Sequence, residues 1–130
     1  MTQEEVIAYF SQDRYAMETT GIEIIEARRD YAKTKLKVSG KHHNANGSVM
    51  GGCIYTLADF TFALASNVDN SDTCTLSSNI IFNAPARGEY LYAESSVIKS
   101  GRTIATFEVK VTDESDKLIA TATMMGFRKV

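Results

Sequence analysis

The sequence lacks the patterns that mark secreted and membrane-spanning proteins. Its only two cysteines, Cys53 and Cys74, fit neither a C-x-x-C pair nor a disulfide framework, so we expect free thiols in a reducing cytoplasm. The first residues, MTQEEVIAYFSQDR, contain no basic segment followed by an apolar run, so we predict no signal peptide. Glycines, threonines and an acid interrupt the longest apolar segment, and we therefore expect no membrane span.

Excess positive charge and metal ligands are also scarce. Lysine and arginine total 14 against 16 aspartates and glutamates, a net charge of -2, so we expect no broad basic face for nucleic acid. The two histidines, His42 and His43, are adjacent in an expected loop, where neighbouring side chains point in different directions. Without a third histidine or a cysteine cluster, we expect no metal site.

The chain does have enough apolar residues for one core. It has 130 residues, 44% of them hydrophobic and 23% charged, which predicts a single domain over residues 1–130. Residues 3–11 place their apolar side chains on one face of a short amphipathic helix. Strand-like stretches rich in β-branched and aromatic residues occupy 21–30, 31–40, 73–82, 89–100, 102–113 and 117–129.

The segment 51–66 is apolar on nearly all sides, which predicts a buried helix. Turn residues at 99–103 (KSGRT) and 113–117 (DESDK) predict hairpins between the later strands. The sole proline, Pro85, separates two strands, where its missing backbone donor does least harm. The order of elements predicts an α+β protein in which a curved antiparallel sheet wraps around one long buried helix, with a short helix at the N-terminus.

A single acid, Asp59, lies in the middle of the predicted long helix. Because its neighbours Ala58, Phe60, Phe62 and Ala63 are apolar, a desolvated carboxylate with a raised pKa is favoured over a solvated surface acid. A general base or a nucleophile requires such a group. Asp59 is therefore our candidate for the reacting side chain.

Gly51 and Gly52 begin the same helix, with Ser48 as the expected N-cap. Their N–H groups lack intrahelical partners, and the absence of side chains lets a substrate carbonyl approach, although close helix packing explains a glycine pair equally well. Gly51 and Asp59 are eight residues apart, which is about 12 Å along a helix and too far for both to act on one carbonyl carbon. Two antiparallel copies across a two-fold axis would bring them together, so we predict an obligate dimer with two composite sites.

Asn44, Met50-Gly51-Gly52 and Asp59 together resemble the PaaI-like acyl-CoA thioesterases of the hotdog fold. That family has an asparagine six residues before a His-Gly-Gly and an aspartate nine residues after the histidine. The similarity extends through LADFTFALASN, SSNIIFNAPARGE and KSGRT, and so covers most of the chain. The resemblance implies hydrolysis of an acyl-CoA thioester, with coenzyme A as part of the substrate, no other cofactor, and assembly into homodimers and homotetramers.

The resemblance also implies roles for individual residues. The Gly51 N–H would polarise the thioester carbonyl, Asp59 of the facing subunit would act as general base or nucleophile, and Asn44 would position water or substrate. Thr75 falls where some relatives have a hydroxyl that helps to hold the water. The remaining residues implied in substrate or coenzyme A binding are Met50, Gly52, Phe82, Asn83, Arg87, Lys99, Gly101, Arg102 and Thr103.

The sequence departs from the family pattern at one residue, and three alternatives to the Asp59 mechanism remain open. Met50 replaces the family histidine, and a thioether cannot donate a hydrogen bond, so either His43 compensates or turnover or substrate differs. A non-catalytic acyl-CoA-binding protein is a second reading. A third makes Cys53 the nucleophile, with its pKa lowered by the helix dipole and His43 as base. The hotdog hydratases pair an acid with a catalytic histidine, and no histidine follows His43.

Overall fold

The alternating apolar and polar residues form one six-stranded antiparallel sheet in the computed structural model, which describes residues 1–129. The strand order is β1-β2-β4-β5-β6-β3, so the third strand pairs with the last. The strands are β1 (Ile22–Arg28), β2 (Tyr31–Lys37), β3 (Thr73–Phe82), β4 (Tyr90–Ser100), β5 (Ile104–Asp113) and β6 (Leu118–Arg128). All six predicted strands are confirmed, as are both hairpins.

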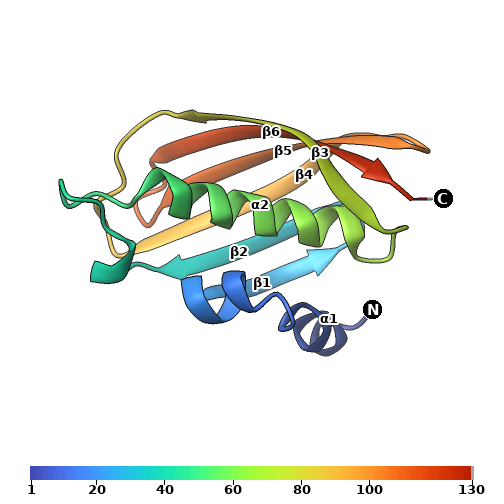
Figure 1. The fold of residues 1–130 in the computed structure, drawn as a ribbon, viewed down its shortest axis with the longest axis horizontal. Coiled ribbons are helices and arrows are strands. Elements are labelled where there is room, and N and C mark those ends of the chain that lie inside the picture. Colours follow the sequence, from blue (N-terminus) through green and yellow to red (C-terminus); the bar gives the residue numbers. More distant parts are fainter. Residues whose placement is uncertain (130) are drawn as a thin grey trace.

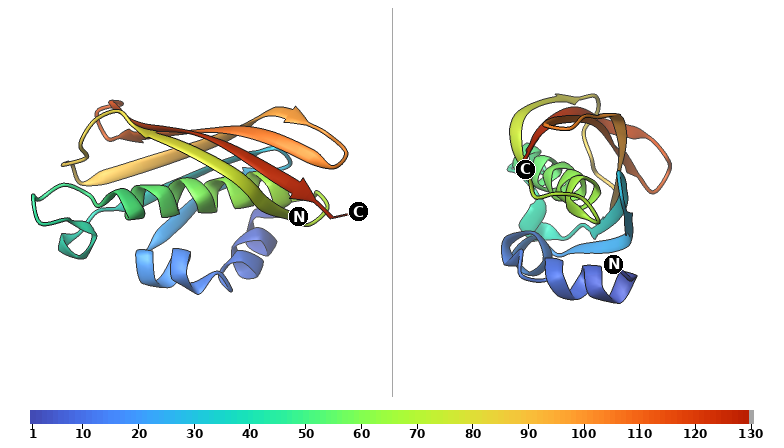
Figure 2. Two further views of the ribbon diagram at one scale, coloured as in Figure 1. Left: turned by 45° about the horizontal axis from the view of Figure 1, so that its top comes forward. Right: turned by 90° about the vertical axis from the view of Figure 1, so that its right-hand side faces the viewer.

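The sheet curves around one long helix, α2 (Gly51–Asn67), which contacts every strand (Figures 1 and 2). Most α2 side chains are buried because the helix is apolar on nearly all sides. The Phe62 ring meets that of Phe107 on β5 edge to face, with centroids 5.5 Å apart. The predicted sheet wrapped around a buried helix is confirmed, and this is the hotdog arrangement.

The N-terminal segment packs across β1 and the open side of α2 (Figure 2). The predicted short helix is α1 (Gln3–Phe10), which begins with a capping box between Thr2 and Glu5. The Gln3 side chain donates to the Ala27 carbonyl oxygen and accepts from the Ala27 N–H, which fixes α1 to β1. A π-helical turn, Tyr15–Thr20, follows, and a short 3-10 turn, Gly40–His42, precedes α2. Neither turn was predicted.

The strand β3 forms an edge of the sheet and pairs only with β6 within residues 1–129. Its side chains are mostly exposed although several are large and apolar, among them Leu76, Ile81 and Phe82. An edge strand with unpaired backbone groups and exposed apolar side chains is a surface suited to pairing with another strand.

Candidate active site

The helix α2 begins without a side-chain cap. The N-cap is Met50, so the predicted cap Ser48 is wrong; the Ser48 hydroxyl instead accepts a hydrogen bond from Arg87 Nε at 3.1 Å. Within residues 1–129, no acceptor takes the N–H of Gly51 or Gly52. These two donors therefore remain available at the positive end of the helix dipole.

Five predicted site residues meet around a cavity of about 460 Å³ at this end of α2. The residues are Asn44, Gly51, Phe82, Asn83 and Arg87, from the preceding loop, the helix start, the end of β3 and the segment after it. A Cβ at Gly51 would lie 3.4 Å from Cζ of the Phe82 ring, so the helix start packs directly on that ring. The cavity thus combines the free Gly51 N–H, the Phe82 ring and the Arg87 cation.

Asn44 shapes the loop that closes this cavity. Its Oδ1 accepts hydrogen bonds from the N–H of Asn46 at 2.9 Å and of Ser48 at 3.1 Å. This is the behaviour of a turn-forming asparagine, so the side-chain oxygen is already engaged. Among the described residues, no acceptor takes the Asn44 side-chain N–H₂, which leaves that donor free for a ligand.

Met50 and Gly52 face a second cavity, of about 440 Å³, on the other side of the helix start. Cys53, His42 and Tyr15 also line it. The Met50 side chain is 59% exposed, and its N–H donates to the His42 carbonyl oxygen at 2.9 Å. The two predicted binding residues Met50 and Gly52 are therefore separated from Gly51 and Phe82 by the helix itself.

The alternative with Cys53 as nucleophile loses support in this cavity. Burial raises the pKa of the Cys53 thiol, the opposite of the lowering that a nucleophile at a helix N-terminus needs. The histidine that lines the cavity is His42, whereas the expected base, His43, does not line it.

Asp59 is half-buried and lines a third cavity, of about 320 Å³, together with Asp13, Tyr15 and Thr56. Burial is the main cause that raises the pKa of the Asp59 carboxyl, and the nearby charge of Asp13 raises it further. The Thr75 hydroxyl, on β3, lies close enough to the carboxyl to lower its pKa in part. Asp59 and Thr75 of one chain therefore lie side by side, and burial favours the raised pKa expected for the Asp59 carboxyl.

One chain does not unite Gly51 with Asp59. Both belong to the regular helix α2, where their separation is about 12 Å along the axis, and they line different cavities. The free N–H donors and the half-buried carboxyl of a single chain cannot contact one carbonyl group.

The KSGRT turn, with Lys99, Gly101, Arg102 and Thr103, connects β4 and β5 at the opposite end of the molecule from the start of α2 (Figure 1). Arg128 marks this end, because it donates to Ser66 near the end of α2 and to Ser100 at the end of β4. Within one chain, the predicted coenzyme A residues are thus divided into two groups, one at each end of α2.

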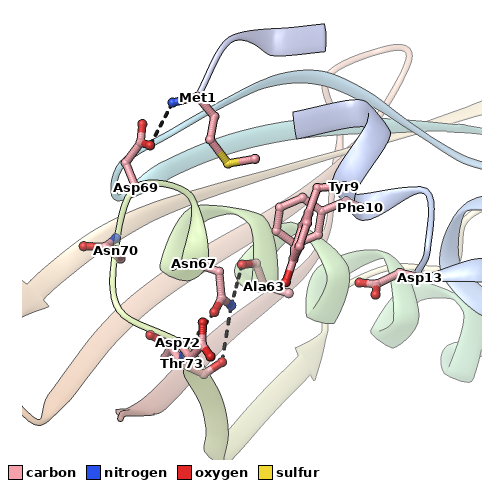
Figure 3. A pocket seen from close by; sticks show the side chains of 10 residues that line it. All are labelled: Met1, Tyr9, Phe10, Asp13, Ala63, Asn67, Asp69, Asn70, Asp72 and Thr73. Atoms are coloured by element: carbon pink, nitrogen blue, oxygen red, sulfur yellow. Dashed lines mark hydrogen bonds and ion pairs between the residues drawn. The ribbon is translucent and has the colours of Figure 1, made fainter. Parts of the chain in front are cut away.

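Sequence reasoning missed Asp13 and Tyr15, which border Asp59. They lie where α1 gives way to the π-helical turn, a stretch without helical or strand periodicity. Asp13 also lines an adjoining cavity of about 550 Å³, whose wall includes Asp69 and Asp72 (Figure 3). The sequence offers no local signal that these acids approach α2.

No group of three histidine, cysteine, aspartate or glutamate side chains within residues 1–129 is arranged to hold a metal ion. No helix in the same range has the length and apolar character needed to cross a membrane.

Both the sequence and the fold of this chain are similar to those of known proteins. Residues 46–120 match the thioesterase superfamily. Human acyl-coenzyme A thioesterase 13 is 32% identical over 127 residues, covering 92% of this chain and 91% of the relative. A solved mutant of phenylacetic acid degradation protein PaaI from Thermus thermophilus is 31% identical, with a TM-score of 0.82 and coverage of 87% and 97%. A Streptococcus mutans protein, solved bound to acetyl-CoA, is 26% identical, with a TM-score of 0.79 and coverage of 83% and 88%.

Proposed function

This chain belongs to the thioesterase superfamily, and from that premise we propose that it hydrolyses acyl-CoA thioesters to a free acid and coenzyme A. The observation that carries the proposal is the half-buried Asp59 carboxyl, with its raised pKa and the Thr75 hydroxyl beside it, on a helix whose first N–H groups have no acceptor among residues 1–129. A carbonyl-polarising donor and a desolvated base are the two groups that thioester hydrolysis requires.

The site is composite and needs two copies of the chain. Gly51 and Asp59 are about 12 Å apart along α2, so a thioester bound to one cannot reach the other in the same chain. Two antiparallel α2 helices related by a two-fold axis bring the Gly51 end of each beside Asp59 of the other, giving two equivalent sites. The exposed edge of β3 supplies a surface for this pairing. Association of two dimers into a tetramer follows only from the resemblance.

The same two-fold arrangement reunites the residues for coenzyme A. If the two β3 edges pair antiparallel, the Phe82 end of one strand meets the Thr73 end of the other. The Thr73 end is joined through Arg128 to Ser100, at the base of the KSGRT turn. The Lys99 and Arg102 side chains of one chain would then flank Phe82, Asn83 and Arg87 of its partner, as a clamp for the phosphates of coenzyme A.

The reaction uses these groups in a fixed order. The Gly51 N–H donates to the thioester carbonyl oxygen and stabilises the negative charge that develops there. The partner's Asp59 either removes a proton from a water held by Thr75 or attacks the acyl carbon directly. The C–S bond then breaks, the thiolate takes up a proton, and water supplies the hydroxyl of the free acid. No metal or organic cofactor takes part in this scheme.

The decisive experiment measures the release of free coenzyme A from short-chain, medium-chain and aromatic acyl-CoA thioesters. We expect turnover by the wild-type protein and a loss of about 10²- to 10⁴-fold in kcat for Asp59→Asn, because the reacting carboxylate is removed. A wild-type protein that binds coenzyme A esters without hydrolysing them would instead establish the non-catalytic reading.

The two free cysteines support a reducing cytoplasmic location.

A further inference from the structure

His42 is a buried histidine that the proposed reaction does not use. Its side chain is 7% exposed and lies between two backbone groups. The Ser39 N–H donates to Nδ1 at 3.0 Å, and Nε2 lies 2.7 Å from the Thr20 carbonyl oxygen. A carbonyl only accepts and a backbone N–H only donates, so Nε2 carries a proton and Nδ1 does not. This environment selects one neutral tautomer of the ring.

The backbone of His42 holds the residue that immediately precedes Gly51. Its carbonyl oxygen accepts from the N–H of Met50, the N-cap of α2, at 2.9 Å. A β-bridge between His43 and Val49 braces the same loop. No described side chain caps α2, so these backbone contacts fix where the helix starts and where the Gly51 N–H points.

The ring also ties this loop to the segment beside Asp59. Thr20, which accepts from Nε2, ends the π-helical turn that begins at Tyr15, and Tyr15 lines the Asp59 cavity. The His42 ring therefore connects the loop that leads to the proposed donor, Gly51, with the turn that borders the proposed base, Asp59.

We propose that His42 is a positioning residue: its neutral ring, with the proton on Nε2, holds the start of α2 so that the Gly51 N–H faces the thioester carbonyl. The proposal rests on the proposed function for its catalytic consequence, although the structural part stands separately. A second proton on Nδ1 would turn an acceptor into a donor that opposes the Ser39 N–H, and the loop would lose its anchor.

The surroundings of His42 offer no compensation for a charged ring. The titratable groups that share its cavity are Lys41 from the 3-10 turn, Tyr15 from the π-helical turn and Cys53 from α2. None of them is a carboxyl group, and Lys41 is itself a cation, so no titratable group in this cavity would pair with a charged ring. The contacts of the ring therefore fit the neutral tautomer.

Two variants test the hydrogen bonds of the ring. His42→Phe keeps an aromatic ring but removes the hydrogen bonds of both ring nitrogens, and we expect kcat to fall about ten- to a hundredfold with a smaller change in KM, because a misplaced donor weakens mainly the transition state. His42→Asn keeps an oxygen acceptor near the Nδ1 position. We expect this variant to keep more of the wild-type kcat than His42→Phe, because the acceptor for the Ser39 N–H is retained.

A matched control is Gln3→Leu. This change also removes two side-chain hydrogen bonds to the backbone, at Ala27, but far from the start of α2. We expect it to lower Tm without changing kcat. If Gln3→Leu and His42→Phe lose equal activity at equal loss of Tm, His42 is merely structural and the proposal fails.

A readout without substrate keeps this inference distinct from the proposed function. Nitrogen-15 NMR of the wild-type ring should show the Nε2–H tautomer, and amide exchange at Ser39 and Met50 should be faster in His42→Phe than in the wild type. The opposite tautomer, or exchange at Met50 that is indifferent to His42→Phe, overturns the inference. If the NMR result holds while no acyl-CoA is hydrolysed, the positioning of the α2 start stands and the proposed thioesterase activity is the part that fails.

Discussion

The ring of Phe82 lies against Gly51, so that a methyl group at position 51 would be 3.4 Å from the ring carbon Cζ. This is an ordinary van der Waals contact, and the backbone of α2 can accept alanine there. The fold therefore does not require glycine at position 51. The absence of a side chain there leaves the Gly51 N–H accessible to a ligand.

Gly51→Ala should consequently separate stability from activity. Alanine is the better helix former, so we expect Tm to stay the same or to rise. The free energy of unfolding should increase by no more than about 1 kcal/mol. The added methyl group narrows the approach of a thioester carbonyl to the N–H, and kcat/KM should fall about tenfold or more. Thermal unfolding and coenzyme A release on the same preparation check both parts. A fully active Gly51→Ala protein would remove Gly51 from the mechanism.

Asp59→Asn should gain stability in a defined pH range. Burial raises the pKa of the Asp59 carboxyl, so the native state keeps this proton to a higher pH than the unfolded chain does. The wild type therefore loses stability as pH rises from the unfolded pKa, about 3.9, through the folded pKa. The amide does not titrate, and Asp59→Asn should be the more stable protein above this range and gain nothing below it. Chemical denaturation at several pH values measures the difference, and a variant that is less stable at pH 7 would contradict the assigned burial effect.

Asp13→Asn tests whether the neighbouring acid tunes Asp59. The charge of Asp13 contributes to the raised pKa of the Asp59 carboxyl, so its removal should lower that pKa. Because the base must be deprotonated, the acid limb of kcat/KM should move to lower pH, with little change on the plateau. Asp72→Asn, which alters another acid of the adjoining cavity, is the matched comparison. An equal shift of the acid limb in both variants would mean that the overall charge of the cavity, rather than Asp13 in particular, raises the pKa of Asp59.

Arg128→Met should cost much of the stability of the fold. The Arg128 side chain is nearly fully buried and donates to Ser66, Thr73 and Ser100, and its Nη2 lies 3.5 Å from Oδ1 of Asp30. Methionine fills similar space but removes three hydrogen bonds and the ion pair with Asp30, which costs about 3 kcal/mol. Urea denaturation should show this loss without a change in m-value. A loss below about 1 kcal/mol would mean that water replaces the guanidinium.

Subunit mixing tests the composite site. Asp59→Asn and Asn44→Ala homodimers each lack one component in both sites, whereas a mixed dimer carries one intact site and one doubly damaged site. We expect partial recovery of activity on mixing, up to about a quarter of the wild-type value for random exchange of inactive subunits. Mixing each variant with itself is the control. An active monomer in sedimentation at assay concentration would rule out the shared site.

The strands and the long helix were predictable because their residues repeat with the periods of two and 3.6 that burial on one side or all sides imposes. The starts of the helices were less so. Serine is a residue type favoured at an N-cap. The Ser48 hydroxyl nevertheless accepts a hydrogen bond from Arg87, thirty-nine residues away, and the N-cap is Met50. A local rule cannot register a contact made by a distant side chain.

The site was foreseeable only in its parts. Asp59 is conspicuous because it is a lone acid in an apolar helix, and Thr75 was placed beside it by resemblance rather than by any pattern in its own strand. Asp13 carries no such signal, since its approach to α2 depends on how the segment around the π-helical turn packs against α2. The separation of Gly51 from Asp59 followed from the rise of a helix alone.

The pairing of β3 with β6 also orders events during synthesis. The long helix and β3 leave the ribosome before β4, β5 and β6, but β3 finds its only described partner in Leu118–Arg128. Arg128, which joins the end of α2 to β3 and β4, follows all of these elements in the chain. The nascent chain must therefore hold an apolar helix and an unpaired strand until β6 emerges, so the sheet cannot be completed strand by strand in the order of synthesis.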